Sequence, residues 1–148
     1  MQWRPRLGIY ASDNRKVRYY ADRGAVYSYE TKVGQAYSEH KILILTDHNY
    51  SRTTNSHYGD IIIFFRERGY KIARCVSTMT HYPDVDNLMR ANQYRISELQ
   101  EQIKRKRSPA VISTYQYVIE MFSESNKIMG ELLFSKLIEE QLGVRDAG

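Results

Sequence analysis

The pattern of apolar and polar positions changes near residue 83. Before it, short apolar runs alternate with turn-forming residues, which predicts strands at residues 15–21, 25–31, 35–38, 41–46 and 70–77. After it, apolar residues recur at helical spacing and predict two helices, at residues 84–106 and 109–143. We therefore expect one α+β domain over residues 1–148, with a small, mostly antiparallel sheet in a β-rich basic half (15–82) and a C-terminal antiparallel helical hairpin (84–143).

The predicted strands have distinct roles. Residues 41–46 (KILILT) are the most apolar and are expected at the centre of the sheet. Within residues 25–31, Val26, Ser28 and Glu30 fall on one side, and Tyr27 and Tyr29 on the other. Residues 22–24 (DRG) predict a turn, and Gly34 predicts a break or a bulge.

One further helix is predicted inside the first half. Tyr58, Ile61, Ile62 and Phe65 recur at i, i+3, i+4 and i+7, so residues 54–68 are expected to form an amphipathic helix that packs on the sheet. Thr53 or Thr54 is the candidate N-cap and Gly69 the candidate C′ residue. The alternative is a strand at residues 60–65, because IIIFF is rich in β-branched and aromatic residues. The lack of alternation there favours the helix.

The two long helices carry clear start signals. Asp84 or Asp86 suits the N-cap of the first, and Ser108 followed by Pro109 marks the start of the second. Residues 123–126 are a candidate break in the second helix, and Gly143 is expected to end it. Its apolar residues from 132 to 138 spread around much of the circumference. We therefore expect the chain to form a homo-oligomer.

Composition indicates an ordinary soluble domain. The 148 residues are 42% hydrophobic and 26% charged, and no run approaches the roughly 18 apolar residues of a membrane span. The first ten residues lack an apolar core typical of a secretory signal. The single cysteine, Cys75, lies among apolar neighbours and is expected to be a buried thiol. We expect no membrane association and a cytoplasmic location, in the host cell if the protein is viral.

Charge and tyrosine are concentrated in the first half. Residues 1–80 hold 13 Lys and Arg against 7 Asp and Glu, and ten of the 13 tyrosines precede residue 83. Basic residues mixed with aromatic ones are typical of surfaces that contact phosphates and stack bases. The same composition suits strands with solvated edges, since tyrosine favours strands and basic residues protect sheet edges.

Polar residues gather at the start of the 54–68 helix. The first turn of a helix has unpaired N–H groups and the positive end of the dipole, so it suits a phosphate group. The candidate phosphate ligands are Tyr50, Arg52, Thr53, Thr54, Ser56 and His57. His57 is also the candidate general acid or base for phosphodiester cleavage without a metal. The structural alternative is that the hydroxyl residues only cap the helix.

A second basic cluster joins the two long helices. Lys104, Arg105, Lys106 and Arg107 form a KRKR corner that could contact a nucleic-acid backbone or act as a nuclear import signal. The alternative is a solvated helix end, favoured there by the helix dipole.

Several kinds of chemistry lack a motif in this sequence. There is no HExxH or paired-cysteine zinc spacing, no glycine-rich phosphate loop, and no GxSxG nucleophile elbow. We therefore predict no metal site and no cofactor.

Two segments resemble small phage and mobile-element proteins. The matching residues are Tyr27, Ser28, Tyr29 and Thr31, then Tyr50, Ser51, Thr53, Thr54, Ser56 and His57, in a Y-S-Y-x-T … Y-S-x-T-T-S-x-H pattern. Asn55 is an extra residue relative to the tightest form of that pattern. The resemblance covers about a fifth of the chain and leaves out both long helices. It implies an origin in a virus or mobile element and a shared site, but no activity.

Three hypotheses follow. The first is a phage-type accessory protein that binds DNA, RNA or a phosphate-bearing ligand through the basic, tyrosine-rich half and the helix N-terminus. The second is a metal-independent phosphodiesterase or nuclease that uses His57. The third is an inhibitor that binds a host protein, such as a defence factor, through the helical hairpin.

Overall fold

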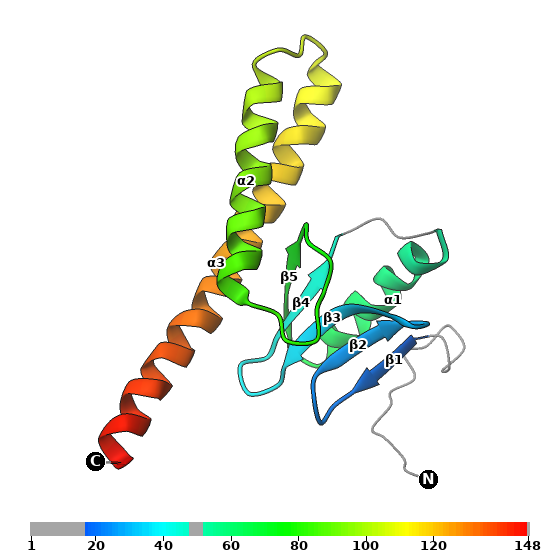
Figure 1. Ribbon diagram of the computed structural model, residues 1–148. Helices are drawn as coiled ribbons and strands as arrows, with labels where there is room; N and C mark the ends of the chain where they lie inside the picture. The colour runs from blue at the N-terminus through cyan, green and yellow to red at the C-terminus, as the bar shows by residue number, and fades with distance from the viewer. Residues whose placement is uncertain (1–16, 48–51, 148) are drawn as a thin grey trace. The chain divides into compact units, whose positions relative to one another are not determined.

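The computed structural model describes residues 17–47 and 52–147. Five strands form one sheet in the order β1-β2-β3-β4-β5, with the bounds Val17–Tyr20, Ala25–Ser28, Thr31–Tyr37, Ile42–Thr46 and Lys71–Cys75 (Figure 1). The helices of these residues are α1 (Arg52–Glu67), α2 (Val85–Ile103) and α3 (Pro109–Ala147). The predicted α+β class is confirmed.

Neighbouring strands β1 to β4 pair antiparallel, and β4 pairs parallel with β5. A parallel pair needs a crossover connection, which α1 provides. β4 is buried along its whole length, as its apolar sequence requires. Its predicted central position is wrong, because only β5 lies beyond it and β3 is the middle strand.

Helix α1 packs on one face of the sheet (Figure 1). Its residues Tyr58, Ile61 and Phe65 are buried in one cluster with Tyr19 and Leu43 from the strands. The ring centroids of Tyr19 and Phe65 lie 4.9 Å apart in an edge-to-face arrangement. The helical spacing of the sequence is therefore confirmed, and the strand alternative for residues 60–65 is wrong.

The two ends of α1 differ in how well they were predicted. The helix begins at Arg52, so Thr53 and Thr54 lie inside its first turn and the prediction that one of them is the N-cap is wrong. At the other end Gly69 has a φ of +84°. Its N–H donates to the Arg66 carbonyl, and the Tyr70 N–H donates to the Phe65 carbonyl, each at 3.0 Å. This is a Schellman motif, and it confirms Gly69 as the C′ residue.

A β-bulge interrupts the pairing of β2 with β3. Val26 lies opposite Gly34 and Tyr27 lies opposite Lys32, so Val33 is the extra residue. The bulge predicted near Gly34 is thus confirmed. Its consequence is that Lys32 and Gln35, three positions apart, lie on the same face and bond to each other at 2.7 Å.

Contacts divide the chain into two compact units, residues 1–83 and 84–148. In the second unit, Asp84 caps α2 by accepting hydrogen bonds from the N–H groups of Asp86 and Asn87. Helix α3 begins at Pro109, and the Ser108 carbonyl accepts from the Ile112 N–H at 3.1 Å. Both predicted starts are confirmed.

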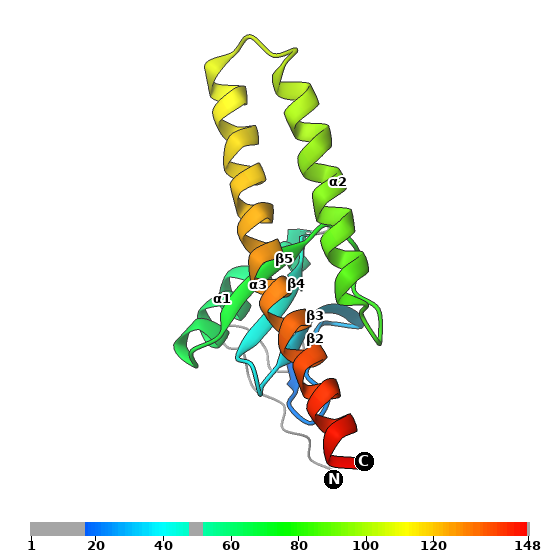
Figure 2. The ribbon, with the colours of Figure 1, turned by 90° about the vertical axis from the view of Figure 1, so that its left-hand side faces the viewer.

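Helices α2 and α3 run antiparallel and pack together (Figure 2). Helix α2 ends at Ile103, earlier than predicted, and α3 is continuous, so the predicted break at 123–126 and the predicted end at Gly143 are wrong. Asn126 stays helical because its side chain bonds to α2 rather than to its own backbone. Glycine lowers helix stability but does not remove a backbone hydrogen bond.

The buried apolar residues of the hairpin include Leu88, Ile96, Leu99, Phe122, Met129 and Leu132. Helix α3 continues beyond the N-terminal end of α2, where Phe134, Leu137 and Ile138 are exposed (Figure 2). No helix among the described residues is long and apolar enough to cross a membrane.

Candidate functional site

The sheet face opposite α1 carries Arg18, Tyr20, Tyr27 and Lys32 from the first three strands. Residues paired across antiparallel strands point to the same face. Arg18 pairs with Tyr27, and Tyr27 pairs with Lys32, so these three form a row across β1, β2 and β3. Tyr20 and Gln35 belong to the next row. The intervening residues Val17, Tyr19 and Val26 are buried under α1. The side chains of the two rows therefore point to the other face of the sheet.

Arg18 is held between two tyrosine rings. Its guanidinium carbon lies 5.5 Å from the Tyr27 ring centroid and 5.7 Å from that of Tyr20. Its Nη1 donates to the Tyr20 hydroxyl at 3.0 Å, and its Nη2 donates to the Tyr29 carbonyl. The Glu30 carboxylate, 3.9 Å away, is almost fully exposed and offsets little of the charge. A positive charge is thus fixed between aromatic surfaces.

Arg23 extends this arrangement at the β1–β2 turn. The turn was predicted from the sequence, and Gly24 there has a φ of +75°. The Arg23 guanidinium carbon lies 5.9 Å from the Tyr20 ring centroid, while its carbonyl accepts from Gln35 Nε2 at 2.7 Å. The turn therefore presents an exposed cation over the same ring. We call Arg18, Tyr20, Arg23 and Tyr27 the tyrosine–arginine face.

Lys32 is buried at the end of the first row, and it has no carboxylate partner among the described residues. Its Nζ donates to Gln35 Oε1 at 2.7 Å, to the Thr80 carbonyl at 2.9 Å and to the His81 carbonyl at 3.1 Å. Burial, together with the charge of Arg23, lowers the pKa of Lys32 below its usual value. An ammonium group has three donors, and all three are used. Lys32 therefore anchors the connector that follows β5.

His57 belongs to α1 and therefore lies on the other side of the sheet. The helix begins at Arg52, so His57 is its sixth residue and not part of the first turn as predicted. It is 5% exposed, and its Nδ1 lies 2.7 Å from the Oγ of Ser28, which is fully buried. The Tyr29 ring centroid is 5.7 Å from that of His57. His57 is thus part of a strand–helix contact.

The other candidate phosphate ligands are only partly placed. Arg52, Thr53, Thr54 and Ser56 lie in the first five residues of α1. The orientations of their side chains, and Tyr50 as a whole, lie outside what the structure describes. The phosphate site at this helix end stays a prediction.

Cys75 is buried, as predicted, at the end of β5. Its Sγ lies 3.6 Å from the Ser77 carbonyl, and burial raises the pKa of the thiol to about 12. A protonated and inaccessible thiol is a poor nucleophile. Its role is in packing.

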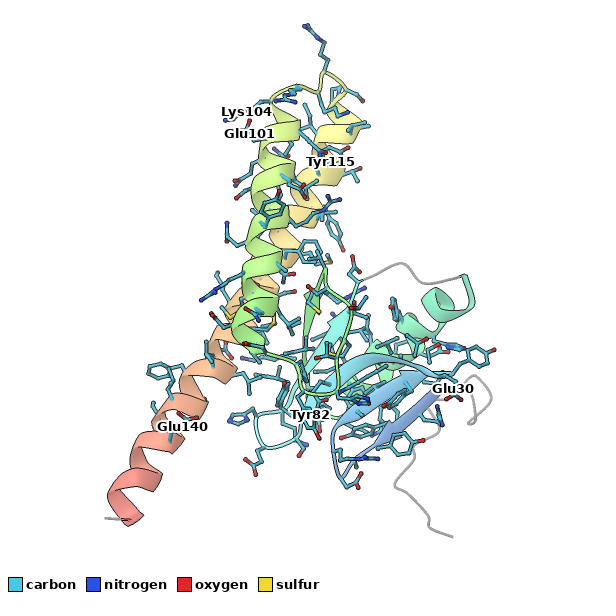
Figure 3. The ribbon with its side chains drawn as sticks, viewed as in Figure 1. Glu30, Tyr82, Glu101, Lys104, Tyr115 and Glu140 are labelled. Atoms are coloured by element: carbon cyan, nitrogen blue, oxygen red, sulfur yellow. The ribbon has the colours of Figure 1, made fainter. Side chains whose placement is uncertain are left out.

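The KRKR corner lies between α2 and α3, beyond the last residue of α2. All four side chains are exposed, and Lys104 Nζ lies 3.1 Å from Glu101 Oε1 (Figure 3). Within the described part of the chain, the other three cations make no ion pair. They retain their charge for a partner.

Metal and family comparisons add no further assignment. No group of three or more His, Cys, Asp or Glu residues that could hold a metal occurs among the residues that the structure describes. Comparison of the chain with models of known families, with curated proteins and with solved structures gave no match.

Two parts of the site were not predicted from the sequence. The tyrosines and arginines stand out as a class, but the row that Arg18, Tyr27 and Lys32 form does not. Ser28 was likewise missed as the partner of His57. The alternation that placed Val26 and Ser28 on one side of β2 was the available signal.

Proposed function

We propose that this protein binds nucleic acid through the tyrosine–arginine face. The observation that carries the proposal is the Arg18 guanidinium carbon, which lies 5.7 Å from the Tyr20 ring centroid and 5.5 Å from that of Tyr27. Aromatic rings on a sheet face can stack on bases, and neighbouring guanidinium groups attract the phosphate backbone. The concentration of positive charge in residues 1–80 supports the same function.

The KRKR corner is proposed as a second contact for the backbone. Arg105, Lys106 and Arg107 are exposed, and counterion release would make their contribution strongly dependent on salt. The resemblance to phage proteins supports an accessory role in a virus or mobile element.

Fluorescence anisotropy with labelled DNA and RNA, single- and double-stranded, tests binding. We expect binding at about 50 mM salt, and an affinity at least about tenfold lower at about 200 mM salt. Arg23→Ala removes an exposed cation of the face and is expected to weaken binding. The matched control is Arg95→Ala, an exposed arginine of α2 that pairs with Glu98. Absence of binding to all four probes at about 50 mM salt would overturn the proposal.

A metal-independent phosphodiesterase is the second candidate. The 2.7 Å contact between Ser28 Oγ and His57 Nδ1 joins a hydroxyl to an imidazole, the two groups that a hydroxyl nucleophile and its general base require. Both side chains are buried, however, and for that reason we favour binding. Labelled oligonucleotides and cyclic nucleotides incubated in EDTA test this activity. Product formation that is lost in His57→Ala would support it, and absence of product would contradict it.

The helical hairpin supports an interaction role. Phe134, Leu137 and Ile138 are exposed on the part of α3 that extends past α2, and they are proposed to contact a second copy or a host protein. Sedimentation over a range of concentrations tests self-association. A pull-down from host lysate after nuclease treatment tests the inhibitor hypothesis.

A further inference from the structure

Tyr82 is the most exposed large hydrophobic side chain among the described residues, at 93%. It lies on the connector after β5, within the first compact unit (Figure 3). Its ring centroid is 6.5 Å from that of His81, which is also exposed. Such an aromatic surface in water is available for stacking.

The connector that carries Tyr82 is tied to the sheet at a defined place. Lys32 Nζ donates to the carbonyls of Thr80 and His81, directly before Tyr82 in the chain. Lys32 is also the residue paired with Tyr27. These hydrogen bonds therefore hold the connector at the end of the row that begins with Arg18 and Tyr27.

The hydrogen bonds of Lys32 define its role. Its three partners are neutral acceptors that use its three donors, so it has no N–H left for a phosphate. Lys32 is a positioning residue, and the phosphate contacts fall to Arg23 and its neighbours. A substitution at Lys32 should therefore affect how bases stack on Tyr82, and not the attraction of the face for phosphate groups.

We propose that Tyr82 is a base-stacking platform and that the ligand of this face is single-stranded nucleic acid. This inference rests on the proposed function and narrows its ligand from nucleic acid in general to single strands. In a duplex the base faces are covered by their neighbours, whereas in a single strand successive bases can stack on separate aromatic side chains. The first unit offers the exposed ring of Tyr82 and, on the sheet, the half-buried ring of Tyr27, whose centroid lies 5.5 Å from the Arg18 guanidinium carbon.

Anisotropy with fluorescein-labelled oligo(dT) and oligo(U) of about 12 nucleotides, and with a mixed-sequence duplex, tests the ligand class. We expect single strands to bind at least about tenfold more tightly than the duplex. Tyr82→Ala is expected to weaken single-strand binding about tenfold, and Tyr82→Phe to retain it, since stacking needs the ring and not the hydroxyl. Tyr94→Ala, at a 70% exposed tyrosine of α2, is the matched control and should bind like wild type.

The Lys32→Met variant tests whether Lys32 acts by positioning the connector or through its own charge. We expect weaker single-strand binding with an unchanged slope of log affinity against log salt, whereas Arg23→Ala should reduce the slope by about one contact. Circular dichroism checks that Lys32→Met is folded. If it is not folded, the comparison of Tyr82→Ala with Tyr82→Phe tests the inference without it. Equal binding of single strand and duplex, or wild-type affinity in Tyr82→Ala, would overturn this inference and leave the proposed function standing. Failure of every probe to bind would overturn the proposed function itself.

Discussion

Ser28 Oγ and His57 Nδ1 lie 2.7 Å apart, although 29 positions separate the two residues in the chain. The contact joins β2 to α1 in the interior of the first unit. Ser28 lies in the Tyr27–Thr31 segment, and His57 ends the Tyr50–His57 segment, so each of the two segments with the predicted resemblance contributes one residue to this contact. A strand–helix contact of this kind gives the pattern a structural meaning that needs no catalysis.

Replacing Ser28 tests this contact. Ser28→Ala removes the hydroxyl next to a buried imidazole, and we expect a loss of about 1–2 kcal/mol in the free energy of unfolding. Urea unfolding followed by tyrosine fluorescence and circular dichroism measures it. The matched control is Ser38→Ala, at an exposed serine in the turn after β3, which should leave the free energy of unfolding nearly unchanged.

A double-mutant cycle with His57→Phe measures the coupling between the two side chains. If they support each other, the double variant should be less destabilised than the sum of the single variants, with a coupling of about 1 kcal/mol. Additive effects would show that the contact contributes nothing to stability.

Alanine substitutions at two glycines are expected to change the stability of the protein in opposite directions. At Gly24, with a φ of +75°, an added Cβ would lie 2.1 Å from the Ala36 carbonyl oxygen, so Gly24→Ala should destabilise the protein by more than about 2 kcal/mol. At Gly59, inside α1, nothing lies within 4 Å, and Gly59→Ala should stabilise it by up to about 1 kcal/mol. Thermal unfolding of both variants checks the pair, and a stable Gly24→Ala would contradict the turn geometry.

Asn92 and Asn126 form a buried polar link in the helical hairpin. Asn92 Nδ2 donates to Asn126 Oδ1 at 3.0 Å, and Asn126 Nδ2 donates to the Met89 carbonyl at 3.1 Å. Asn92→Leu should cost about 1–3 kcal/mol, because it deprives the Asn126 amide of a donor. Adding Asn126→Leu should restore part of the loss. Hydrogen exchange of the α2 and α3 amides measures this, and unchanged protection in Asn92→Leu would argue against the link.

Stability is expected to fall in alkaline solution. Burial raises the pKa of Cys75 from 9.0 and of Tyr37 from 10.0, each to about 12. As the pH rises through these ordinary values, the unfolded chain loses the protons first, so both groups lower the free energy of unfolding between their ordinary and raised pKa values. The lowered pKa of Lys32 acts in the opposite direction and offsets part of this effect.

Cys75→Ala isolates the thiol contribution. Urea midpoints between about pH 7 and about pH 10 should decline less steeply in this variant than in wild type. The native protein should also resist a thiol reagent that labels it fully in urea. Rapid labelling of the folded protein would show that Cys75 is accessible.

Local sequence signals predicted most of the elements. The strand predicted at residues 25–31 is wrong, because β2 ends at Ser28 and β3 begins at Thr31, with a turn at Tyr29 and Glu30 between them. The periodicity of Tyr58, Ile61 and Phe65 was enough for α1, because burial of one helical face needs only local spacing. Asp84, Pro109 and Gly69 marked helix ends because caps depend on neighbouring backbone groups. The end of β-rich sequence and the division into two compact units coincide near residue 83.

Long-range pairing was the part that sequence could not supply. The row of Arg18, Tyr27 and Lys32 depends on the strand register and on the extra residue Val33, neither of which is encoded by alternation within one strand. The Ser28–His57 contact depends on where α1 crosses the sheet. The start of α1 was predicted too late in the chain, because Arg52 and Thr53 are polar and do not belong to the apolar repeat of the helix.

The KRKR corner provides a test that is independent of the sheet. Lys104 pairs with Glu101, which leaves Arg105, Lys106 and Arg107 as exposed cations in the second unit. Replacing these three by serine should lower the slope of log affinity against log salt by up to about 2 for single strands, since each backbone contact contributes about 0.7. Binding of a single strand to the tyrosine–arginine face should persist, because that face belongs to the first unit. Lys127→Ser, an exposed lysine of α3, is the control. An unchanged slope in the triple variant would show that the corner is a solvated helix end, favoured by the dipole of α2, and would confine nucleic-acid binding to the sheet.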